Sequence, residues 1–278
     1  MREGTRATSR RLRRGMPLPA HFHVFWRALD ELLARVRPVW WGAVVTDPRF
    51  PAIWDANYAR VDAPGHDLHA MDVEIELVPA LAEVGADVMH VVSFDPSSTT
   101  DLLAELSTRG HRIGWDLLMD LGGDPPTDDG VRTEEVALDD ELWSRIAASL
   151  TLFGVSSEVA PQLVRLEREV LGPGGKRWFG VRDERQTVVS MASLILLEGV
   201  GYVDHVVTFP AWRGRGLASA ITARICREAR DAGAAHVSLL ADPDATSTVA
   251  MYERLGFRGS GSLASTRGPV PQPGDVSR

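Results

Sequence analysis

Residues 213–218 read RGRGLA, and this short stretch decides how the rest of the chain is interpreted. A strand-like run, Tyr202 to Thr208, precedes it, and apolar residues recur every four positions from Leu217 to Ile225 after it. A glycine-rich turn that opens a helix presents free backbone N–H groups beside the positive end of the helix dipole, which suits a phosphate or pyrophosphate. The pattern therefore predicts a strand, an anion-binding turn and a helix in succession.

Two further elements follow the turn. Residues 235–240 (AHVSLL) read as the next strand, and residues 249–257 (VAMYERLGF) read as a short helix that Gly256 stops. The order is thus strand, turn, helix, strand, helix, which is typical of a sheet covered by helices.

This order and two motifs within it resemble the GCN5-related N-acetyltransferase (GNAT) family. The family's signature is Arg or Gln, two residues, Gly, one residue, then Gly or Ala, which here is Arg213, Gly216 and Ala218. Its second hallmark is a tyrosine four residues before a Gly-Phe pair, which here is Tyr252. The resemblance implies an α/β (α+β) GNAT fold, with a mixed central sheet flanked by helices.

The resemblance also implies acetyl-CoA as cosubstrate and assigns residues to it. Backbone groups of Val206, Val207 and Thr208 are expected to bind the pantetheine arm. The side chains of the same strand residues also suit a core, and the two roles are compatible because binding uses the backbone. The turn is expected to hold the pyrophosphate through Arg213, Gly214, Arg215, Gly216, Leu217, Ala218 and Ser219.

Tyr252 is the candidate general acid under this resemblance. A phenol has a reference pKa of about 10, so it is protonated at neutral pH and can give a proton to a departing thiolate. A tyrosine packed on its helix with no catalytic part is the alternative. The chain departs from the family pattern nearby, because Ala245 and Thr246 stand where an asparagine is common, with Ser247 or Thr248 as substitutes.

Asp204 is the candidate general base. Strand alternation predicts that it shares a face with Val206 and Thr208 and that His205 points to the opposite face. A carboxylate there could accept a proton from a substrate ammonium, directly or through water. An amine that arrives partly neutral needs no strong base. Three other residues remain alternatives for this role: Glu198, His205 and Asp242.

The N-terminal half repeats part of the C-terminal layout. Strand, Asp-Pro, helix, Gly, strand occurs at residues 88–119 and again at 235–265, which predicts a degenerate GNAT-like domain without a glycine-rich turn. Coincidence of a common layout is the alternative. Residues 20–37 read as an amphipathic helix that Pro38 ends. The expected divisions are a basic disordered tail 1–17, the degenerate domain 18–121, a linker 122–131, the catalytic domain 132–266 and a disordered tail 267–278.

Composition limits the other possibilities. The net charge of −8 argues against nucleic-acid binding by the chain as a whole, and no apolar run is long enough to cross a bilayer, which predicts a cytoplasmic protein without membrane contact. The one cysteine, Cys226, falls beside an apolar helix face and is expected to be inert. No histidines have metal-ligand spacing, so no metal site is expected; those considered are His21, His23, His66 and His69.

The leading functional prediction is an acetyl-CoA-dependent N-acetyltransferase that acts on a small-molecule or peptide primary amine by direct attack. A non-catalytic acyl-CoA sensor or protein-interaction module on the same fold is the alternative. A monomer and a homodimer both fit the sequence. Lys176 is the only lysine among 30 basic residues, and this arginine usage is typical of a GC-rich bacterial genome.

Overall fold

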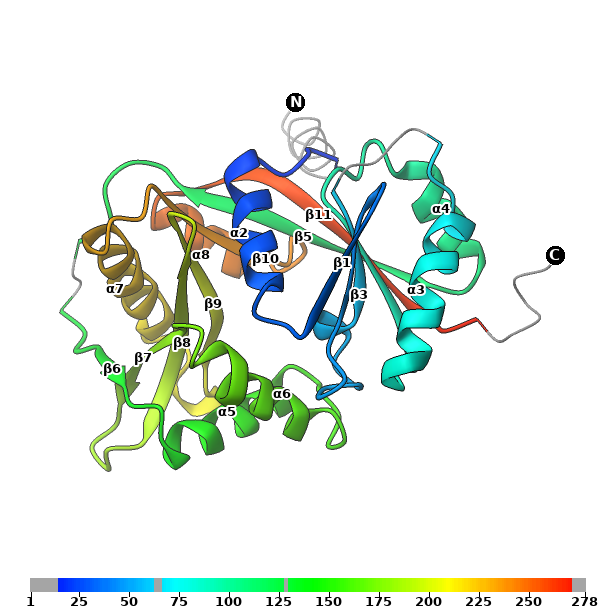
Figure 1. Cartoon of the computed structure of the whole chain (residues 1–278). Coiled ribbons are helices and arrows are strands. Elements are labelled where there is room, and N and C mark those ends of the chain that lie inside the picture. The colour runs from blue at the N-terminus through cyan, green and yellow to red at the C-terminus, as the bar shows by residue number, and fades with distance from the viewer. Residues whose placement is uncertain (1–14, 63–66, 128–129, 272–278) are drawn as a thin grey trace. The chain divides into compact units, whose positions relative to one another are not determined.

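The computed structural model describes residues 15–62, 67–127 and 130–271, and it divides the chain into two compact units (Figure 1). Unit 1 comprises residues 1–118 and 260–278, and unit 2 comprises residues 119–259. The boundaries fall within β5 and β11, so each unit holds part of both strands. Each unit is a mixed sheet with helices packed on it, which confirms the predicted fold class.

Unit 1 has the strand order β1-β2-β3-β4-β11, in which β3 is parallel to β4 and the pairs β1–β2, β2–β3 and β4–β11 are antiparallel. Its elements are α2 (Ala20–Asp30), β1 (Arg35–Val39), β2 (Gly42–Thr46), the short helix η1 (Trp54–Ala56), β3 (Tyr58–Val61), α3 (Ala70–Val84), β4 (Val88–Ser93), α4 (Thr100–Thr108), most of β5 (Arg112–Leu121) and most of β11 (Phe257–Pro269).

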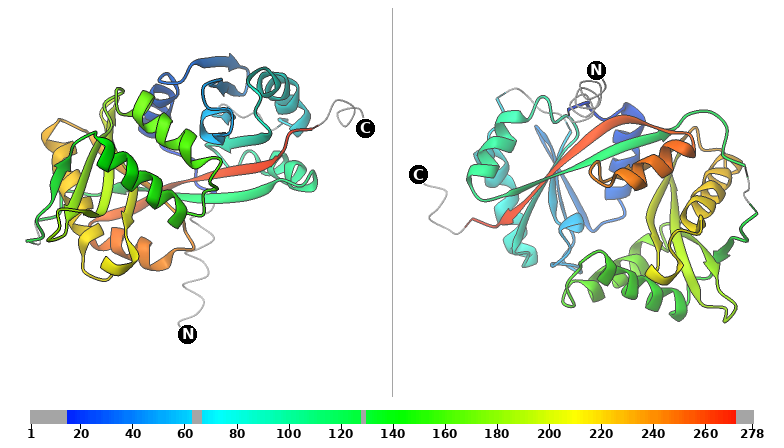
Figure 2. Two further views of the ribbon diagram at one scale, coloured as in Figure 1. Left: turned by 90° about the horizontal axis from the view of Figure 1, so that it is seen from below. Right: turned by 180° about the vertical axis from the view of Figure 1, so that it is seen from behind.

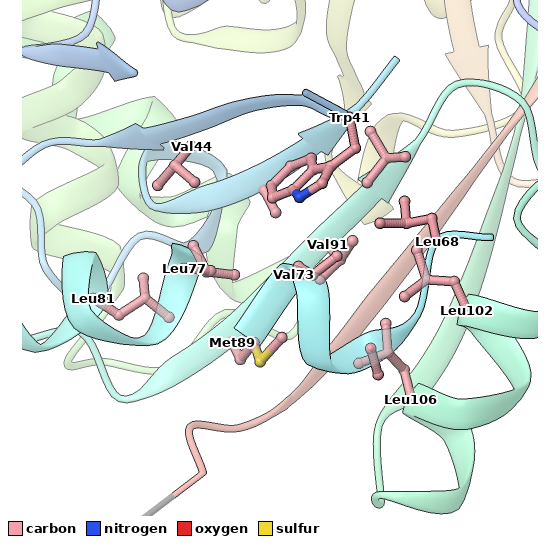
Figure 3. Packing of buried hydrophobic residues seen from close by; sticks show 13 residues of the cluster. Trp41, Val44, Leu68, Val73, Leu77, Leu81, Met89, Val91, Leu102 and Leu106 are labelled. Carbon is pink, nitrogen blue, oxygen red and sulfur yellow. The ribbon is translucent and has the colours of Figure 1, made fainter. Parts of the chain in front are cut away.

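The core of unit 1 lies between the sheet and helices α3 and α4. Alternate strand residues such as Ala59, Val61 and Val91 meet the apolar faces of the two helices, and Trp41 closes the cluster at its edge (Figure 3). The intervening residues of β3 face α2, where Tyr58 is hydrogen-bonded by Trp26. The period of two along β3 therefore separates two packed layers.

Two expectations about unit 1 are wrong. The helix predicted over 20–37 ends at Asp30, and residues 35–39 form β1 instead. Pro38 disfavours a helical conformation in the residue before it and removes a ladder donor, which an edge strand such as β1 tolerates. Residues 267–269, predicted as part of a disordered tail, belong to β11 and pair with β4.

The unit boundaries also differ from the predicted domains. Residues 260–266 were assigned to the catalytic domain, but they belong to unit 1 because β11 pairs with β4 from Ala264 onward. Met16, predicted within the basic tail, is tied to β11 through a hydrogen bond from Ser262 to its carbonyl oxygen. The rest of that tail, residues 1–14, lies outside the described residues.

Unit 2 has the strand order β10-β9-β8-β7-β6, in which β9 is parallel to β10 and the pairs β8–β9, β7–β8 and β6–β7 are antiparallel. Its elements are β6 (Glu134–Val136), α5 (Asp140–Leu152), α6 (Ala160–Leu166), the π-helical segment η2 (Glu167–Leu171), β7 (Arg177–Arg182), β8 (Val188–Leu197), β9 (Val200–Thr208), the short helix η3 (Pro210–Trp212), α7 (Leu217–Asp231), β10 (His236–Ala241) and α8 (Thr246–Arg254).

Helices cover both faces of the sheet in unit 2 (Figure 2). On one face, α5 buries Ile146 and Leu150 against Trp178 and Met191. On the other face, α7 packs on β7, β8 and β9. Within the described residues no helix is long and apolar enough to cross a membrane.

The contact of α7 with β9 depends on Gly201. A Cβ at this position would lie 2.5 Å from the Cβ of Ala229 on α7. Gly201→Ala is therefore expected to destabilise the protein by about 2 kcal/mol, because the helix must move away from the strand. Chemical denaturation measures the loss. The double variant Gly201→Ala/Ala229→Gly moves the methyl across the interface and should recover most of it; no recovery would show that this contact is not the cause.

Candidate active site

β9 contains a bulge in the stretch where the site was expected. Its pairing with β8 shifts between Met191 and Ser193, so two residues of β9 stand opposite one residue of β8. One of the two, His205, has a φ of 53°, in the left-handed region that non-glycine residues rarely adopt. Bulges bend a strand and increase its twist, so β9 changes direction here.

The bulge changes which side chains share a face. Ser193 pairs with Asp204 and Met191 pairs with Val207, and these two pairs lie on one face of the sheet. The prediction that Asp204 shares a face with Thr208 is therefore wrong. Simple alternation holds only where no residue has been inserted, and a bulge adds one.

β9 leaves β10 just before the bulge. The parallel pairing runs from Val200 opposite His236 to Val203 opposite Leu239, and it ends there. Beyond Val203, the edge of β9 toward β10 is unpaired from residue 204 to residue 208. This unpaired stretch includes the residues that the sequence assigned to the pantetheine arm.

The unpaired edge leads to the N-terminus of α7. Gly216 precedes this helix with a φ of 77°, and no side chain caps it. Gly214 has a φ of 76°, and around both glycines nothing lies within 4 Å of the place of a Cβ. The first N–H groups of α7 thus have no side-chain cap, and the first turn of the helix has no acidic residue.

Arginines surround this turn. The side chain of Arg213 donates to the carbonyl oxygen of Thr208 at 3.1 Å. Arg215 lies above the ring of Trp212 at 4.6 Å, and Arg145 from α5 lies above Phe209 at 3.6 Å. The positive charge of these side chains adds to that of the helix dipole and favours an anion at the turn.

Tyr252 lies on α8 and is 95% buried, edge-on to Phe257 at 5.9 Å. Its hydroxyl makes no hydrogen bond within the part of the chain that the structure describes. Burial raises the pKa of the phenol, and the negative charge of Asp204 raises it further. Tyr252 is therefore a neutral phenol whose proton is not used in a hydrogen bond to another described residue.

Asp204 is held by an ion pair. Lys176 donates to its Oδ2 at 2.8 Å and to Oε1 of Glu167 at 2.7 Å. Burial alone would raise the pKa of the Asp204 carboxyl, but the Lys176 ammonium outweighs burial and holds that pKa below its usual range. A carboxylate with a lowered pKa is a weak proton acceptor, so Asp204 suits electrostatic attraction better than general-base catalysis.

His205 packs between the sheet and α5. Its Nε2 is hydrogen-bonded to Oγ of Ser149 at 2.7 Å, and its ring contacts Phe153 and Trp178 edge-on. Trp178 pairs with Ser193, so His205 lies on the same side of the sheet as Asp204, and the prediction of opposite faces is wrong. Burial lowers the pKa of this imidazole to about 4, which keeps it neutral at pH 7.

The other two alternatives for the base lie in turns. Glu198 is exposed in the hairpin between β8 and β9, at the end of β9 away from residues 204–208. Asp242 follows β10, and its carboxylate accepts a hydrogen bond from the N–H of Asp244 at 2.8 Å. Both side chains are exposed to solvent, and neither lies on the part of β9 that precedes the RGRGLA turn.

The corresponding strand, turn and helix of unit 1 differ from those of unit 2. β3 and β4 remain paired up to Val61 and Ser93, where both strands end. The N–H of Ala70, the first residue of α3, is bonded to the carboxylate of Glu105 at 2.8 Å, and Asp72 accepts from the N–H of His69. Carboxylates of the protein itself thus satisfy this helix start, and part of the turn before it, residues 63–66, lies outside the described residues.

Comparison with known proteins identifies this arrangement. The sequence matches the family described as "Acetyltransferase (GNAT) family" over residues 143–257, which include the bulged strand, the turn and Tyr252. Residues 143–257 belong to the GNAT family. A curated relative, mycothiol acetyltransferase from Nocardiopsis dassonvillei, is 45% identical over 60 residues. That match covers 22% of this chain and 18% of the relative.

Solved structures extend the likeness in fold. A GCN5-related N-acetyltransferase from Kribbella flavida is 18% identical with a TM-score of 0.64, and the match covers 89% of this chain and 93% of that one. A protein of unknown function from Staphylococcus epidermidis gives a TM-score of 0.65 at 13% identity, covering 85% and 94% of the two chains. At these identities the likeness concerns the fold alone.

Sequence reasoning missed the two residues that form the ion-pair cluster with Asp204, Glu167 and Lys176. Neither belongs to a motif, and Lys176 meets Asp204 across 28 positions of sequence. One signal was present, because a single lysine in a chain that otherwise uses arginine marks a place where the two are not interchangeable. Within the described residues no group of histidine, cysteine, aspartate and glutamate side chains could hold a metal ion.

Proposed function

We propose that the protein is an acetyl-CoA-dependent N-acetyltransferase that transfers an acetyl group to a primary amine by direct attack. The observation that carries this proposal is the unpaired edge of β9 from residue 204 to residue 208, which leads to the uncapped start of α7. An extended chain with an anionic group at one end fits such an edge and helix start. The acceptor is a small-molecule or peptide amine.

The residues present fit acetyl-CoA. Backbone groups of Val206, Val207 and Thr208 would bind the pantetheine arm, as a neighbouring strand would. The N–H groups at the start of α7 and the arginines around it would hold the pyrophosphate through charge-assisted hydrogen bonds. This set comprises Arg213, Gly214, Arg215, Gly216, Leu217, Ala218 and Ser219.

Two residues of the chain have separate roles in the reaction, acceptor binding and proton donation. Acetyl-CoA supplies, when bound, the thioester carbonyl that the amine attacks. Asp204, ionised, attracts the ammonium form of the acceptor, which releases one proton to water before its nitrogen bonds to the acetyl carbon. The nitrogen then gives a second proton to water as the C–S bond breaks and the amide forms. Tyr252 gives its proton to the departing thiolate and regains one from solvent, so ammonium and thioester yield amide, thiol and one proton in total.

A covalent enzyme intermediate on cysteine has no support. Cys226 is fully buried within α7, and burial raises the pKa of its thiol to about 12. A buried thiol that stays protonated is not a nucleophile. Direct attack by the amine needs no such group.

We further propose that unit 1 is a degenerate GNAT-like domain, so that the chain is a tandem form with one acetyl-CoA site. A tandem GNAT protein of the clavulanic acid pathway, with a TM-score of 0.51 at 13% identity, has a comparable fold. Isothermal titration is expected to give one acetyl-CoA per chain, because the carboxylates of Glu105 and Asp72 occupy the helix start in unit 1. A second binding event of similar affinity would contradict this expectation.

A panel of amines incubated with acetyl-CoA, with released thiol as the readout, tests the enzymatic proposal. Turnover with at least one amine is expected. The competing function is a sensor that binds acyl-CoA without reaction. Binding of acetyl-CoA with no thiol release from any amine would favour the sensor and contradict the proposal.

A further inference from the structure

Lys176, the only lysine of the chain, is buried between two carboxylates. Its side chain is 2% exposed, its Nζ donates to Glu167 and Asp204, and it lies 5.3 Å from the ring of Trp178. Burying an ammonium is costly unless it is paired and hydrogen-bonded, and here both partners are carboxylates. The ammonium donates to both carboxylates, so each of its two close partners accepts a hydrogen bond from the opposite charge.

The three side chains together carry one negative charge in excess. Glu167 opens the π-helical segment η2, a type of distortion often found at functional sites. Its Oε2 is buried and has no hydrogen-bond partner among the described residues. The side chain of Glu167 is 11% exposed, whereas that of Asp204 is 41% exposed. Of the two carboxylates, Asp204 is therefore the one that solvent or a ligand can contact. It lies in the stretch of β9, residues 204–208, that is not paired with β10.

We propose that Lys176 is a positioning residue: with Glu167 behind it, it holds the Asp204 carboxylate in place as an anion that binds the ammonium group of the acceptor. This inference rests on the proposed function, since it assigns the acceptor subsite of the same reaction. Lys176 itself touches no substrate and acts through Asp204.

The groups that face Asp204 all bear on its ionisation. Burial acts to raise the pKa of Asp204, and it is outweighed by the charge and hydrogen bond of Lys176, just before β7, and by the N–H of His205 in β9. Burial raises the pKa of Glu167 from η2, and the charge of Asp204 raises it further, while Tyr252 from α8 is a neutral phenol. Without Lys176, burial would raise the pKa of Asp204.

The direction in which pH changes acceptor binding follows from the ionisation of Asp204. In the wild type the pKa of Asp204 is below its usual range, so the anion is present throughout an assay between pH 5 and 8. In Lys176→Met the pKa should rise by roughly two units, because burial is no longer compensated. Acceptor binding would then be lost as the pH falls through the raised pKa and would return above it.

The experiment uses the full chain in four forms: wild type, Lys176→Met, Glu167→Gln and the double variant. In Lys176→Met, the buried Glu167 carboxylate would lose its ion-pair partner, and this could prevent folding. The double variant Lys176→Met/Glu167→Gln replaces that carboxylate with a neutral amide, so it keeps the test possible if the single variant misfolds. Carbon-13 NMR of labelled aspartate carboxyls, with Asp204 assigned by its absence in Asp204→Asn, reports the titration midpoint without any turnover. The pH dependence of kcat/KM for the acceptor is measured in parallel.

The Asp204 midpoint and the acidic limb of kcat/KM are expected to rise together by roughly two pH units in Lys176→Met and in the double variant. In Glu167→Gln, which keeps the Lys176 pair, the midpoint should not rise. An unmoved midpoint in both lysine variants overturns the inference, as does a raised midpoint with an unmoved acidic limb. Wild-type protein without turnover would instead refute the proposed function, while the NMR titration still decides whether Lys176 controls Asp204.

Discussion

Tyr252→Phe is expected to lower kcat for acetyl transfer by about 100- to 1,000-fold, the range typical of a lost general acid. Burial and the charge of Asp204 both raise the pKa of this phenol, so the proton is present at every pH at which the protein is assayed. Its hydroxyl has no hydrogen bond to a described residue that would compete for that proton. Phenylalanine keeps the ring that packs edge-on against Phe257 and removes only the donor.

The affinity for acetyl-CoA separates loss of chemistry from loss of binding. Steady-state kinetics measure kcat, and isothermal titration measures the Kd for acetyl-CoA, which should change by less than about two-fold because no phosphate-binding group is altered. Tyr202→Phe, which removes a hydroxyl from β9 in the same unit, serves as the matched control. A Tyr252→Phe protein with wild-type kcat would exclude the tyrosine as the acid.

The local motifs of the GNAT domain were predictable because each lies within one short stretch of chain. The RGRGLA turn was predictable from its two glycines, which precede an amphipathic helix. Gly214 and Gly216 both adopt a positive φ, a conformation that favours glycine. Tyr252 was found by its distance from Gly256 and Phe257, which needs no knowledge of the fold. Both lie in unit 2, where residues 143–257 match the family.

The features that sequence reasoning missed depend on pairing between distant segments. The bulge in β9 exists only relative to β8, and the pattern of residues 200–208 gives no sign of an inserted residue. It is this bulge that brings His205 to the same side as Asp204. The ion pair of Lys176 with Asp204 likewise joins β9 to the residue before β7, two segments that are 28 positions apart in the sequence.

The predicted ends of two elements were wrong for a similar reason. Residues 257–269 are rich in glycine and serine and lack clean alternation, so the extent of β11 and its pairing with β4 could not be predicted. The amphipathic pattern of residues 20–37 continues past the true helix end, because a strand and a helix can share a few apolar spacings.

Gly216→Asp is expected to weaken binding of acetyl-CoA by about 100-fold, a prediction that bears directly on the turn. The substitution places a carboxylate at the uncapped start of α7, where an anion of the ligand would bind. Two unit charges about 4 Å apart repel by about 4 kcal/mol near a protein surface, and salt reduces part of this. The new side chain has room, since nothing lies within 4 Å of the place of its Cβ.

Gly216→Asn is the matched control, because it has nearly the same shape as aspartate and no charge. Asparagine and aspartate both tolerate the left-handed conformation that Gly216 adopts, and both can cap α7, so the backbone cost is similar in the two variants. The difference in Kd between them, measured by isothermal titration at two salt concentrations, therefore isolates the charge. The Kd of the asparagine variant for acetyl-CoA should stay within about five-fold of the wild-type value. Added salt should reduce the difference in Kd between the asparagine and aspartate variants. Equal affinities for the two variants would mean that the anionic part of the ligand binds elsewhere, and the RGRGLA turn would then be a helix start without a ligand.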